Sequence, residues 1–366
     1  MITQTAASPT RPTVAQPTLG EYARAYVARI RGGDIGSMPA VLGLLVLCVV
    51  FSVLRPNFLT LGNFANLFLQ GAAVTVIAMG LVFVLLLGEI DLSAGFTSGV
   101  CAAVLAVLLT WHGWPWYLGV LAALITGTVI GSVLGILVAK VAIPSFVVTL
   151  AAFLAFQGIL LMIIRGGTVI PVRDTVIVAI INRNLPPALG WVFAGVCIVG
   201  FAAVQLTSHR NRVSRGLTAP PIEVVLVRVG LLSVVLIGSV YALNLERSRN
   251  LAVASLKGVP IVVPVIATLL VIGTFLLNRT RFGRHLYAVG GNREAARRAG
   301  INVDRVRIAA FMICSTMAAV GGVIAASRSN SVDANTGGSD VLLLAVGAAV
   351  IGGTSLLGGK GRLVNA

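Results

Sequence analysis

Residues 279–307 read RTRFGRHLYAVGGNREAARRAGINVDRVR, a polar and strongly basic stretch between two long apolar runs. The stretch holds eight arginines and only two acidic residues, Glu294 and Asp304. The flanking runs, 260–278 and 308–326, are each long enough to cross a bilayer as a helix. A basic segment framed in this way is typical of a loop that joins two membrane spans, and it places the chain among the polytopic membrane proteins.

Within this loop, residues 292–301 predict a short helix. Asn292 can cap the start of the helix through its side-chain oxygen, and Gly300 can end it in a left-handed turn. Alanines form a small apolar face on this helix, and arginines form a charged one. A two-turn helix held between membrane spans cannot bury itself, so we expect it to dock on another protein, for which a cytoplasmic motor subunit is the natural candidate. An ordinary positive-inside loop is the alternative interpretation.

The composition of the whole chain agrees with a membrane protein. The chain is 57% hydrophobic and 10% charged, with a mean hydropathy of +1.00, whereas about a quarter of the residues of a soluble domain are charged. We predict an all-α, polytopic integral membrane helical bundle with about ten spanning or broken helices. The predicted segments are 38–54, 66–87, 94–111, 116–138, 144–164, 188–206, 224–243, 260–278, 308–326 and 341–358.

The distribution of basic residues predicts the orientation of the chain. If the N-terminus is cytoplasmic and every segment crosses, the cytoplasmic pieces carry 18 of the 27 Lys and Arg residues and the outer pieces carry 8. This bias supports a cytoplasmic N-terminus, and it explains the net charge of +16 better than nucleic-acid binding does. Residues 1–37 contain no apolar run, so we expect a cytoplasmic tail and no cleavable signal peptide. Residues 38–366 form the predicted transmembrane domain.

A first interrupted element is predicted at residues 88–99, which read GEIDLSAGFTSG. Its two acids are the only ones between Asp34 and Asp174, in a setting where a charge is costly. Small residues follow them and allow the backbone to unwind, and unwound backbone inside a membrane lines transport paths. A short cytoplasmic turn with a capping carboxylate is the alternative. The candidate path residues here are Glu89, Asp91, Ser93 and Gly95.

A second interrupted element is predicted in the other half of the chain. Residues 329–338 read SNSVDANTGG, and Asp340 follows them. Two interrupted elements in opposite halves are the arrangement expected of a central translocation path. We therefore add Asn335 and Asp340 to the candidate path residues.

No catalytic or metal site is predicted. The three histidines are scattered, and the four cysteines lie inside apolar segments without paired spacing. The glycine-rich GTSLLGGKG near the end fails as a phosphate-binding loop, because Gly361 stands where that loop needs a Ser or Thr. We expect no enzymatic activity, no cofactor and no metal in this chain, and we expect any ATP-driven work to come from another subunit.

Three motifs together, GEIDLSAG, FGRHLYAVGGNREAARRAGINVDRVR and AVIGGTSLLGGKG, resemble the permease subunits of bacterial ABC sugar importers, the ribose, xylose and galactoside family. The resemblance covers residues 38–366. Within the family the chain most resembles D-xylose permeases, because it has an inserted helical region over 191–262. Members of the family continue with further hydrophobic helices past the position of Ala366, so we expect that C-terminal helices are missing here.

The resemblance implies a multi-pass protein of the bacterial inner (plasma) membrane that imports a monosaccharide, D-xylose or a related sugar. It implies three protein partners, namely an ATP-binding cassette subunit, an extracytoplasmic sugar-binding protein and a second copy of the permease. The chain would sit in the lipid bilayer and bind no nucleic acid. The cytoplasmic coupling loop would be 279–307. Its ATPase-coupling residues would be Gly290, Gly291, Asn292, Arg293, Glu294, Ala295, Ala296, Arg297, Arg298, Ala299, Gly300 and Ile301.

Two other classes of transporter compete with this interpretation. A permease of the same superfamily for nucleosides or branched-chain amino acids would share the glycines of the broken helices, but the inserted region 191–262 argues against it. An ion-coupled secondary transporter would need a carboxylate in mid-membrane, for which Glu89 and Asp91 are the candidates. That class would leave the basic helix at 292–301 without a role.

Overall fold

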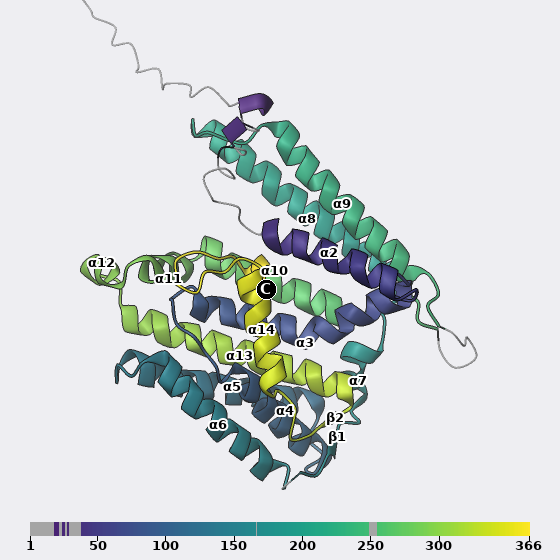
Figure 1. The fold of residues 1–366 in the computed structure, drawn as a ribbon, viewed down its shortest axis with the longest axis vertical. Coiled ribbons are helices and arrows are strands. Elements are labelled where there is room, and N and C mark those ends of the chain that lie inside the picture. The colour runs from purple at the N-terminus through teal and green to yellow at the C-terminus, as the bar shows by residue number, and fades with distance from the viewer. Residues whose placement is uncertain (1–17, 22–23, 26–27, 29–37, 166, 249–254) are drawn as a thin grey trace, which may run out of the picture. The chain divides into compact units, whose positions relative to one another are not determined.

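The computed structural model describes residues 18–21, 24–25, 28, 38–165, 167–248 and 255–366, and these are mainly helical (Figure 1). The helices are α2 (Met38–Leu54), α3 (Leu61–Leu85), α4 (Ala94–Thr110), α5 (Trp116–Ala139), α6 (Ser145–Ile163), α7 (Thr175–Asn182), α8 (Pro187–Ser214), α9 (Ile222–Asn244), α10 (Val262–Arg279), α11 (Arg281–Gly291), α12 (Arg293–Arg298), α13 (Val303–Ser329) and α14 (Ser339–Ile351), with a short 3-10 turn η1 (Leu363–Asn365). Two short strands, β1 (Ile170–Pro171) and β2 (Ser331–Val332), complete the described elements.

Seven helices of the described part of the chain are long and apolar enough to cross a membrane, namely α3, α5, α6, α8, α9, α10 and α13. The apolar helices α2, α4 and α14 are shorter. Each of the ten predicted segments overlaps one of these ten helices, in the same order, so the prediction of an all-α polytopic membrane fold is confirmed.

The two largest errors in the predicted helix ends are at the C-terminal ends of α8 and α14, and glycine explains both. α8 continues eight residues past the predicted end at 206, to Ser214, because its sequence contains no further glycine or proline until Gly216, whose φ is +66°. α14 ends at Ile351 instead of 358, because Gly352 and Gly353 follow, and Gly353 has φ +111°. A positive φ is the conformation in which glycine commonly ends a helix.

The chain divides into two compact units. One contains Pro186–Val259, in which α8 and α9 pack against each other as a helical hairpin. The other contains Ser37–Leu185 and Pro260–Ala366. The hairpin unit covers the part of the chain in which the sequence predicts an inserted helical region, and all the candidate site residues lie in the larger unit.

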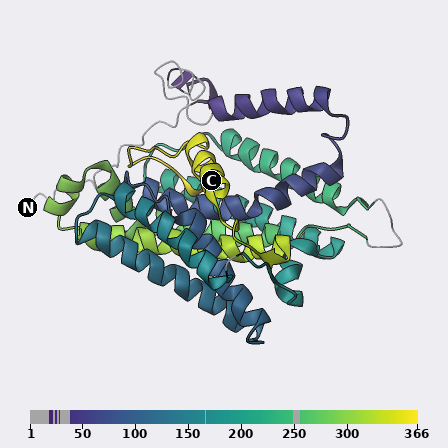
Figure 2. The same ribbon diagram turned by 60° about the horizontal axis from the view of Figure 1, so that its bottom comes forward.

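Helix α13 is the centre of the larger unit. It packs against α3, α4, α5 and α7, and Figures 1 and 2 show it running beside these helices. Its contact with α5 is close because three glycines of α5, Gly127, Gly131 and Gly135, face it. A Cβ atom built on Gly131 would lie 2.5 Å from the carbonyl oxygen of Phe311. Small residues of this kind let two membrane helices approach backbone to backbone.

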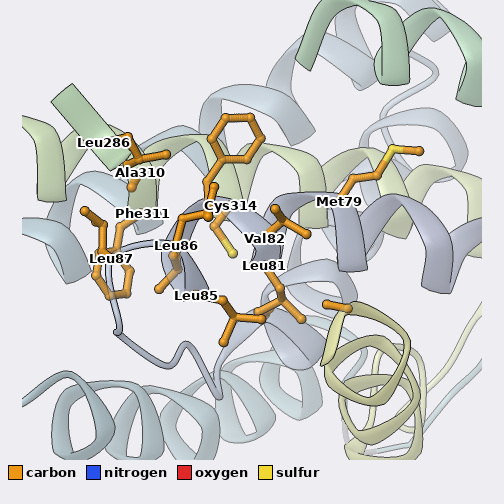
Figure 3. Packing of buried hydrophobic residues seen from close by; sticks show 14 of the residues in the cluster. Met79, Leu81, Val82, Leu85, Leu86, Leu87, Leu286, Ala310, Phe311 and Cys314 are labelled. Carbon is orange, nitrogen blue, oxygen red and sulfur yellow. The ribbon is translucent and has the colours of Figure 1, made fainter. Parts of the chain in front are cut away.

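A cluster of fully buried side chains fixes the end of α3 (Figure 3). Leu85, Leu86 and Leu87 pack with Leu286 of α11 and with Phe311 of α13. Leu86 and Phe311 are both completely shielded from solvent. Burial of large apolar side chains contributes about 1.5–3 kcal/mol each, so this cluster holds the following loop, 88–93, in one place.

The loops of the larger unit gather at two ends. At one end β1 pairs antiparallel with β2, and the Thr110 hydroxyl donates to the carbonyl oxygen of Pro171 at 2.6 Å. The other end, which we call the basic end, consists of the loops 86–93, 140–144, 280–302 and 352–361. In the predicted crossing pattern, all loops of the basic end lie on one side of the membrane, and the loops of the opposite end lie on the other side.

Candidate functional site

The three motifs that carry the family resemblance meet at the basic end. The N–H group of Gly359 donates to the carbonyl oxygen of Leu86 at 2.9 Å. A Cβ atom on Gly290 would lie only 1.8 Å from that same oxygen, and one on Gly88 would lie 3.2 Å from the carbonyl oxygen of Leu357. No side chain fits at Gly290 without moving backbone. The glycines therefore bring the coupling loop, the acidic break and the C-terminal loop into direct backbone contact.

A tyrosine strengthens this contact. The Tyr287 hydroxyl of α11 donates to the carbonyl oxygen of Gly361 at 2.9 Å. Burial raises the pKa of Tyr287, so the hydroxyl keeps its proton and remains a donor at neutral pH. The C-terminal loop 352–361 is thus tied to α11 as well as to the end of α3.

Helix α12 has the caps that the sequence predicts. The Asn292 side-chain oxygen accepts from the N–H group of Ala295 at 2.9 Å. At the other end Gly300 has φ +81°, and the N–H group of Ile301 donates to the carbonyl oxygen of Ala296 at 3.0 Å. This is a Schellman-type ending, which pairs carbonyl groups that would otherwise lack a partner. Both caps are local, so the helix does not need a partner protein in order to form.

The surface of α12 is almost entirely free. All of the residues from Gly291 to Gly300 are exposed except Ala296, whose accessibility is 4%. The sequence places Ala296 on the same small apolar face as Ala299. The structure separates them, because Ala296 packs into the chain's own core and Ala299 stays on the surface. The surface available to a partner therefore consists mainly of arginines and two alanines.

Glu89 lies at the basic end in contact with two arginines. Its Oε1 atom accepts from Nη2 of Arg307 at 2.7 Å, and it also forms an ion pair with Arg293. The Glu89 and Arg307 side chains are 6% and 11% exposed, whereas Arg293 is 46% exposed. The sequence predicts Glu89 beside a substrate path and Arg293 on a partner surface, and it does not predict that the two residues meet. Whether Glu89 contacts substrate stays a prediction.

A cavity of about 420 Å³ opens beside this ion cluster. Its lining residues are Glu89, Val138, Ala142, Ile143, Pro144, Ser145, Phe146, Arg293 and Arg307. The loop between α5 and α6 thus forms one wall, and the ion cluster forms the other. Water in such a cavity can solvate the part of Arg293 that the ion pair leaves exposed.

Asp91 and Ser93 hold the start of α4, in the way that the alternative interpretation, a turn with a capping carboxylate, predicts. Oδ1 of the fully buried Asp91 accepts from the N–H group of Ser93 at 2.9 Å and from the Ser93 hydroxyl at 2.6 Å. Ser93 is the N-cap residue, yet its own side chain forms no cap bond. The capping carboxylate is therefore Asp91, which closes a tight turn with Ser93, directly before the helix.

The residue between the two acids is tied to another helix. The Thr149 hydroxyl of α6 donates to the carbonyl oxygen of Ile90 at 3.2 Å, and the Ile90 N–H group lies 3.5 Å from Oγ of Ser145. These two positions were not among the predicted site residues. The only signal for them in the sequence is a Ser and a Thr four residues apart at the start of an otherwise apolar segment.

Only residues 88–93 of the first predicted interrupted element are non-helical, because α4 begins at Ala94 and the small residues that follow stay helical instead of unwinding. The helical part of this element lies beside the second predicted element. Gly95 and Gly99 of α4 face the non-helical segment 333–338, so that a Cβ atom on Gly99 would lie 2.1 Å from the carbonyl oxygen of Thr336. A Cβ atom on Gly95 would lie 2.7 Å from the carbonyl oxygen of Gly337, which itself has φ +75°. This contact joins the start of α4 to the start of α14.

The segment 333–338 lies within the length of the bundle and not at its end. Ser98 is close to it and packs against Gly322 of α13, whose Cβ would lie 2.2 Å from the carbonyl oxygen of Ser98. Gly322 precedes the end of α13 at Ser329 by seven residues, which corresponds to about 10 Å of helix. Non-helical backbone at membrane depth is tolerated only where it is buried in protein or lines a water-filled cavity.

Two polar residues, one in this segment and one shortly after it, are exposed. Asn335 and Asp340 are both exposed, and within the described part of the chain neither side chain forms a hydrogen bond or an ion pair. An unpaired carboxylate facing lipid is costly. Water, a solute or another protein in front of Asn335 and Asp340 would supply the missing partners, and whether that environment is a transport path stays a prediction.

The structure brings some predicted path residues together and separates others. Gly95 contacts the segment that holds Asn335, and Asp91 and Ser93 fix the helix to which Gly95 belongs. Glu89 belongs instead to the cluster around the coupling loop. The structure does not test whether any of these side chains contacts a substrate, so their role in the path stays a prediction.

The sequence matches a family of permeases and several of its members. The model of a permease family described as "Branched-chain amino acid transport system / permease component" matches residues 63–360. The xylose transport system permease protein of Escherichia coli is 38% identical over 84% of this chain and 76% of its own length. The corresponding protein of Haemophilus influenzae is 34% identical over 88% of this chain and 83% of its own length.

A more distant relative is the ribose import permease protein of Escherichia coli, which is 29% identical over 89% of this chain and 79% of its own length. No solved structure matches the chain. The family match covers the acidic break, the coupling loop and the C-terminal loop, which are the parts that converge at the basic end. The chain therefore belongs to this family of permeases, the membrane components of ABC importers, and is a multi-pass protein of the bacterial inner membrane.

Proposed function

We propose that this chain forms the transmembrane path of an ATP-driven importer of a monosaccharide, D-xylose or a related sugar. The names of the xylose and ribose permeases to which it is similar support the substrate class. The observation that carries the mechanism is α12, a helix with both ends capped and nearly every residue exposed. Such a helix is a preformed docking surface, because little ordering entropy is lost when a partner binds.

In the proposed assembly, residues 290–301 seat on a separate ATP-binding cassette subunit. A second copy of this chain faces the segment 333–340, so that Asn335 and Asp340 line a path between the two copies. An extracytoplasmic sugar-binding protein delivers the sugar at the opposite end. This chain itself performs no covalent chemistry, because ATP is hydrolysed on its partner.

The path residues set the kind of solute that can pass. The Asp340 carboxylate accepts hydrogen bonds, and the Asn335 amide both donates and accepts them. A sugar presents several hydroxyl groups that can use both side chains while it crosses. Two side chains bind a sugar only weakly, which favours passage, so the strong selection among sugars falls to the binding protein.

The test is uptake into proteoliposomes that contain this chain with an ATP-binding cassette subunit and a sugar-binding protein as its partners. We expect ATP-dependent uptake of labelled D-xylose that is insensitive to a proton ionophore. Uptake of leucine or adenosine in its place would favour the alternative permease classes. Uptake that needs no ATPase and collapses with the ionophore would show a secondary transporter and contradict the proposal.

A further inference from the structure

We propose that Glu89 couples movement of the coupling helix α12 to the transport path. Glu89 is thus a positioning residue of the importer. This inference rests on the proposed function, in which α12 seats on an ATPase. Glu89 has no place in that function so far, because it lies with arginines at the basic end and not beside Asn335 and Asp340. Its contacts give it a different task.

The first step is the grouping of charges around Glu89. One carboxylate accepts from two arginines that belong to different helices, Arg293 on α12 and Arg307 on α13. Because Glu89 and Arg307 are nearly excluded from solvent, separating them would leave an uncompensated buried charge. The exposed Arg293 is the member of the cluster that lies on the docking surface. A force on α12 therefore acts on Glu89 directly.

The second step is the backbone contact that accompanies the ion pairs. Gly290, three residues before α12 begins, touches the carbonyl oxygen of Leu86, and the N–H group of Gly359 donates to that oxygen. Leu286 and Ala296 pack in the same buried cluster as Leu86. The elements α11 and α12 and the loop that begins at 86 are thus packed as one body, and densely packed bodies move as units.

The third step runs along the loop itself. Glu89 and Ser93 are four residues apart, a distance of at most about 14 Å of extended chain. At its other end the buried Asp91 holds Ser93, the N-cap residue of α4, through two hydrogen bonds. A short loop with both ends fixed cannot absorb a displacement, so a shift of Glu89 must move the start of α4.

The last step reaches the path. The start of α4 packs through Gly95 and Gly99 onto the backbone of residues 336–338, and α14 with Asp340 begins directly after them. No side chain separates the two backbones, so α4 cannot move without displacing this segment. The connected route from α12 through Glu89 and α4 to Asp340 is the structural basis of the proposal.

The experiment compares two readouts in the reconstituted complex. The first is sugar taken up per ATP hydrolysed. The second is the labelling rate of a single cysteine, Ser339→Cys, in a background without the four native cysteines, measured with and without a non-hydrolysable ATP analogue. The cysteine reports whether the path responds to the nucleotide, and it does so for any transported substrate.

We expect Glu89→Gln to keep ATP hydrolysis while uptake per ATP falls by about tenfold or more, within the range typical of coupling between sites. The nucleotide-dependent change in labelling should disappear as well. Asp304→Asn is the matched control, since it removes an acid at the same end of the molecule that forms no ion pair among the described residues. It should behave as the unmodified complex does.

The charge-swapped variant Glu89→Arg with Arg293→Glu and Arg307→Glu keeps one charge between two charges of opposite sign, and it should restore both readouts. A Glu89→Gln complex that transports and responds like the Asp304→Asn control would overturn the proposal, and so would a swapped variant that assembles but stays uncoupled. If the Gln variant fails to accumulate, the swapped variant alone decides. An unmodified complex that takes up no sugar yet shows the labelling change would refute the proposed substrate and leave the test of Glu89 valid.

Discussion

Gly290 shows how strictly the basic end constrains single residues. Its neighbour Gly291 ends the same helix but has no atom within 4 Å of a Cβ position, whereas Gly290 touches the carbonyl oxygen of Leu86. The two adjacent glycines look equivalent in the sequence, but only the first is at a position where a side chain would clash with the backbone. The first permits close backbone packing, and the second is free to change.

We expect Gly290→Ala to destabilise the protein by about 1–3 kcal/mol, the usual cost of overpacking a core. Gly291→Ala should be neutral or stabilising by up to about 1 kcal/mol, because alanine restricts the unfolded chain. Thermal unfolding of the two variants in the same detergent measures the difference. Equal melting temperatures would contradict the close contact at Gly290.

The capping carboxylate gives a second comparison at this scale. Asp91→Asn keeps an acceptor oxygen for Ser93 and should lower transport only modestly. Asp91→Leu leaves the buried N–H and hydroxyl groups of Ser93 without a partner, at about 1–3 kcal/mol for each lost bond, and should largely stop transport. Uptake of labelled sugar at matched membrane levels decides between them, and near-normal uptake by the Leu variant would reduce this motif to an ordinary turn.

The two acids of the break also show what the sequence can predict at single positions. The pairing of Asp91 with Ser93 is local, and spacing along the chain was sufficient to predict it. The pairing of Glu89 with Arg307 joins residues 218 positions apart. No local pattern reports such a contact, so the sequence could identify Glu89 as unusual and could not name its partners.

At the scale of elements, α12 was predictable because both of its caps are encoded within ten residues. Its orientation was not, since the chain's own core selects Ala296 from among three similar alanines. The glycine row of α5 shows the same limit. A spacing of four residues indicates a close helix pair, but only the structure identifies α13 as the partner.

The free face of α12 can be probed with a matched pair of variants. Ala299→Trp should leave the membrane fold intact and abolish association with the ATPase, because it adds bulk to an exposed surface. Ala296→Trp should instead lower the level of folded protein, because its position is buried. Gel filtration of the purified chain measures folding, and co-purification of the ATPase measures docking. Retention of the ATPase by a well-folded Ala299→Trp variant would place the docking surface elsewhere.

At the scale of the molecule, the order of the ten apolar helices followed from hydropathy alone. The two largest errors in helix ends arose where glycine or its absence overrode the apolar pattern, at α8 and α14. The convergence of three distant motifs at the basic end could not be predicted, because it depends on how α3, α11 and the C-terminal loop pack. The resemblance identified these motifs as important without showing that they touch.

The orientation of the chain remains a prediction, and cysteine labelling in intact cells tests it. In a cysteine-free background, Ser214→Cys and Ala299→Cys should resist a membrane-impermeant thiol reagent, since basic loops stay in the cytoplasm. Val169→Cys, which is 58% exposed and lies at the opposite end of the larger unit, should be labelled. Labelling of the first two positions from outside would overturn the cytoplasmic N-terminus.

The contact between α4 and the segment 333–338 has a consequence for redesigning uptake. Gly95, Gly99 and Gly337 meet backbone to backbone, so any library of variants at these positions would lose folded protein before it changed preference. Asn335 and Asp340 stand next to this contact with side chains that the chain's own packing does not use. A laboratory evolution of sugar preference should therefore randomise these two positions alone, where new side chains can be sampled without loss of the scaffold.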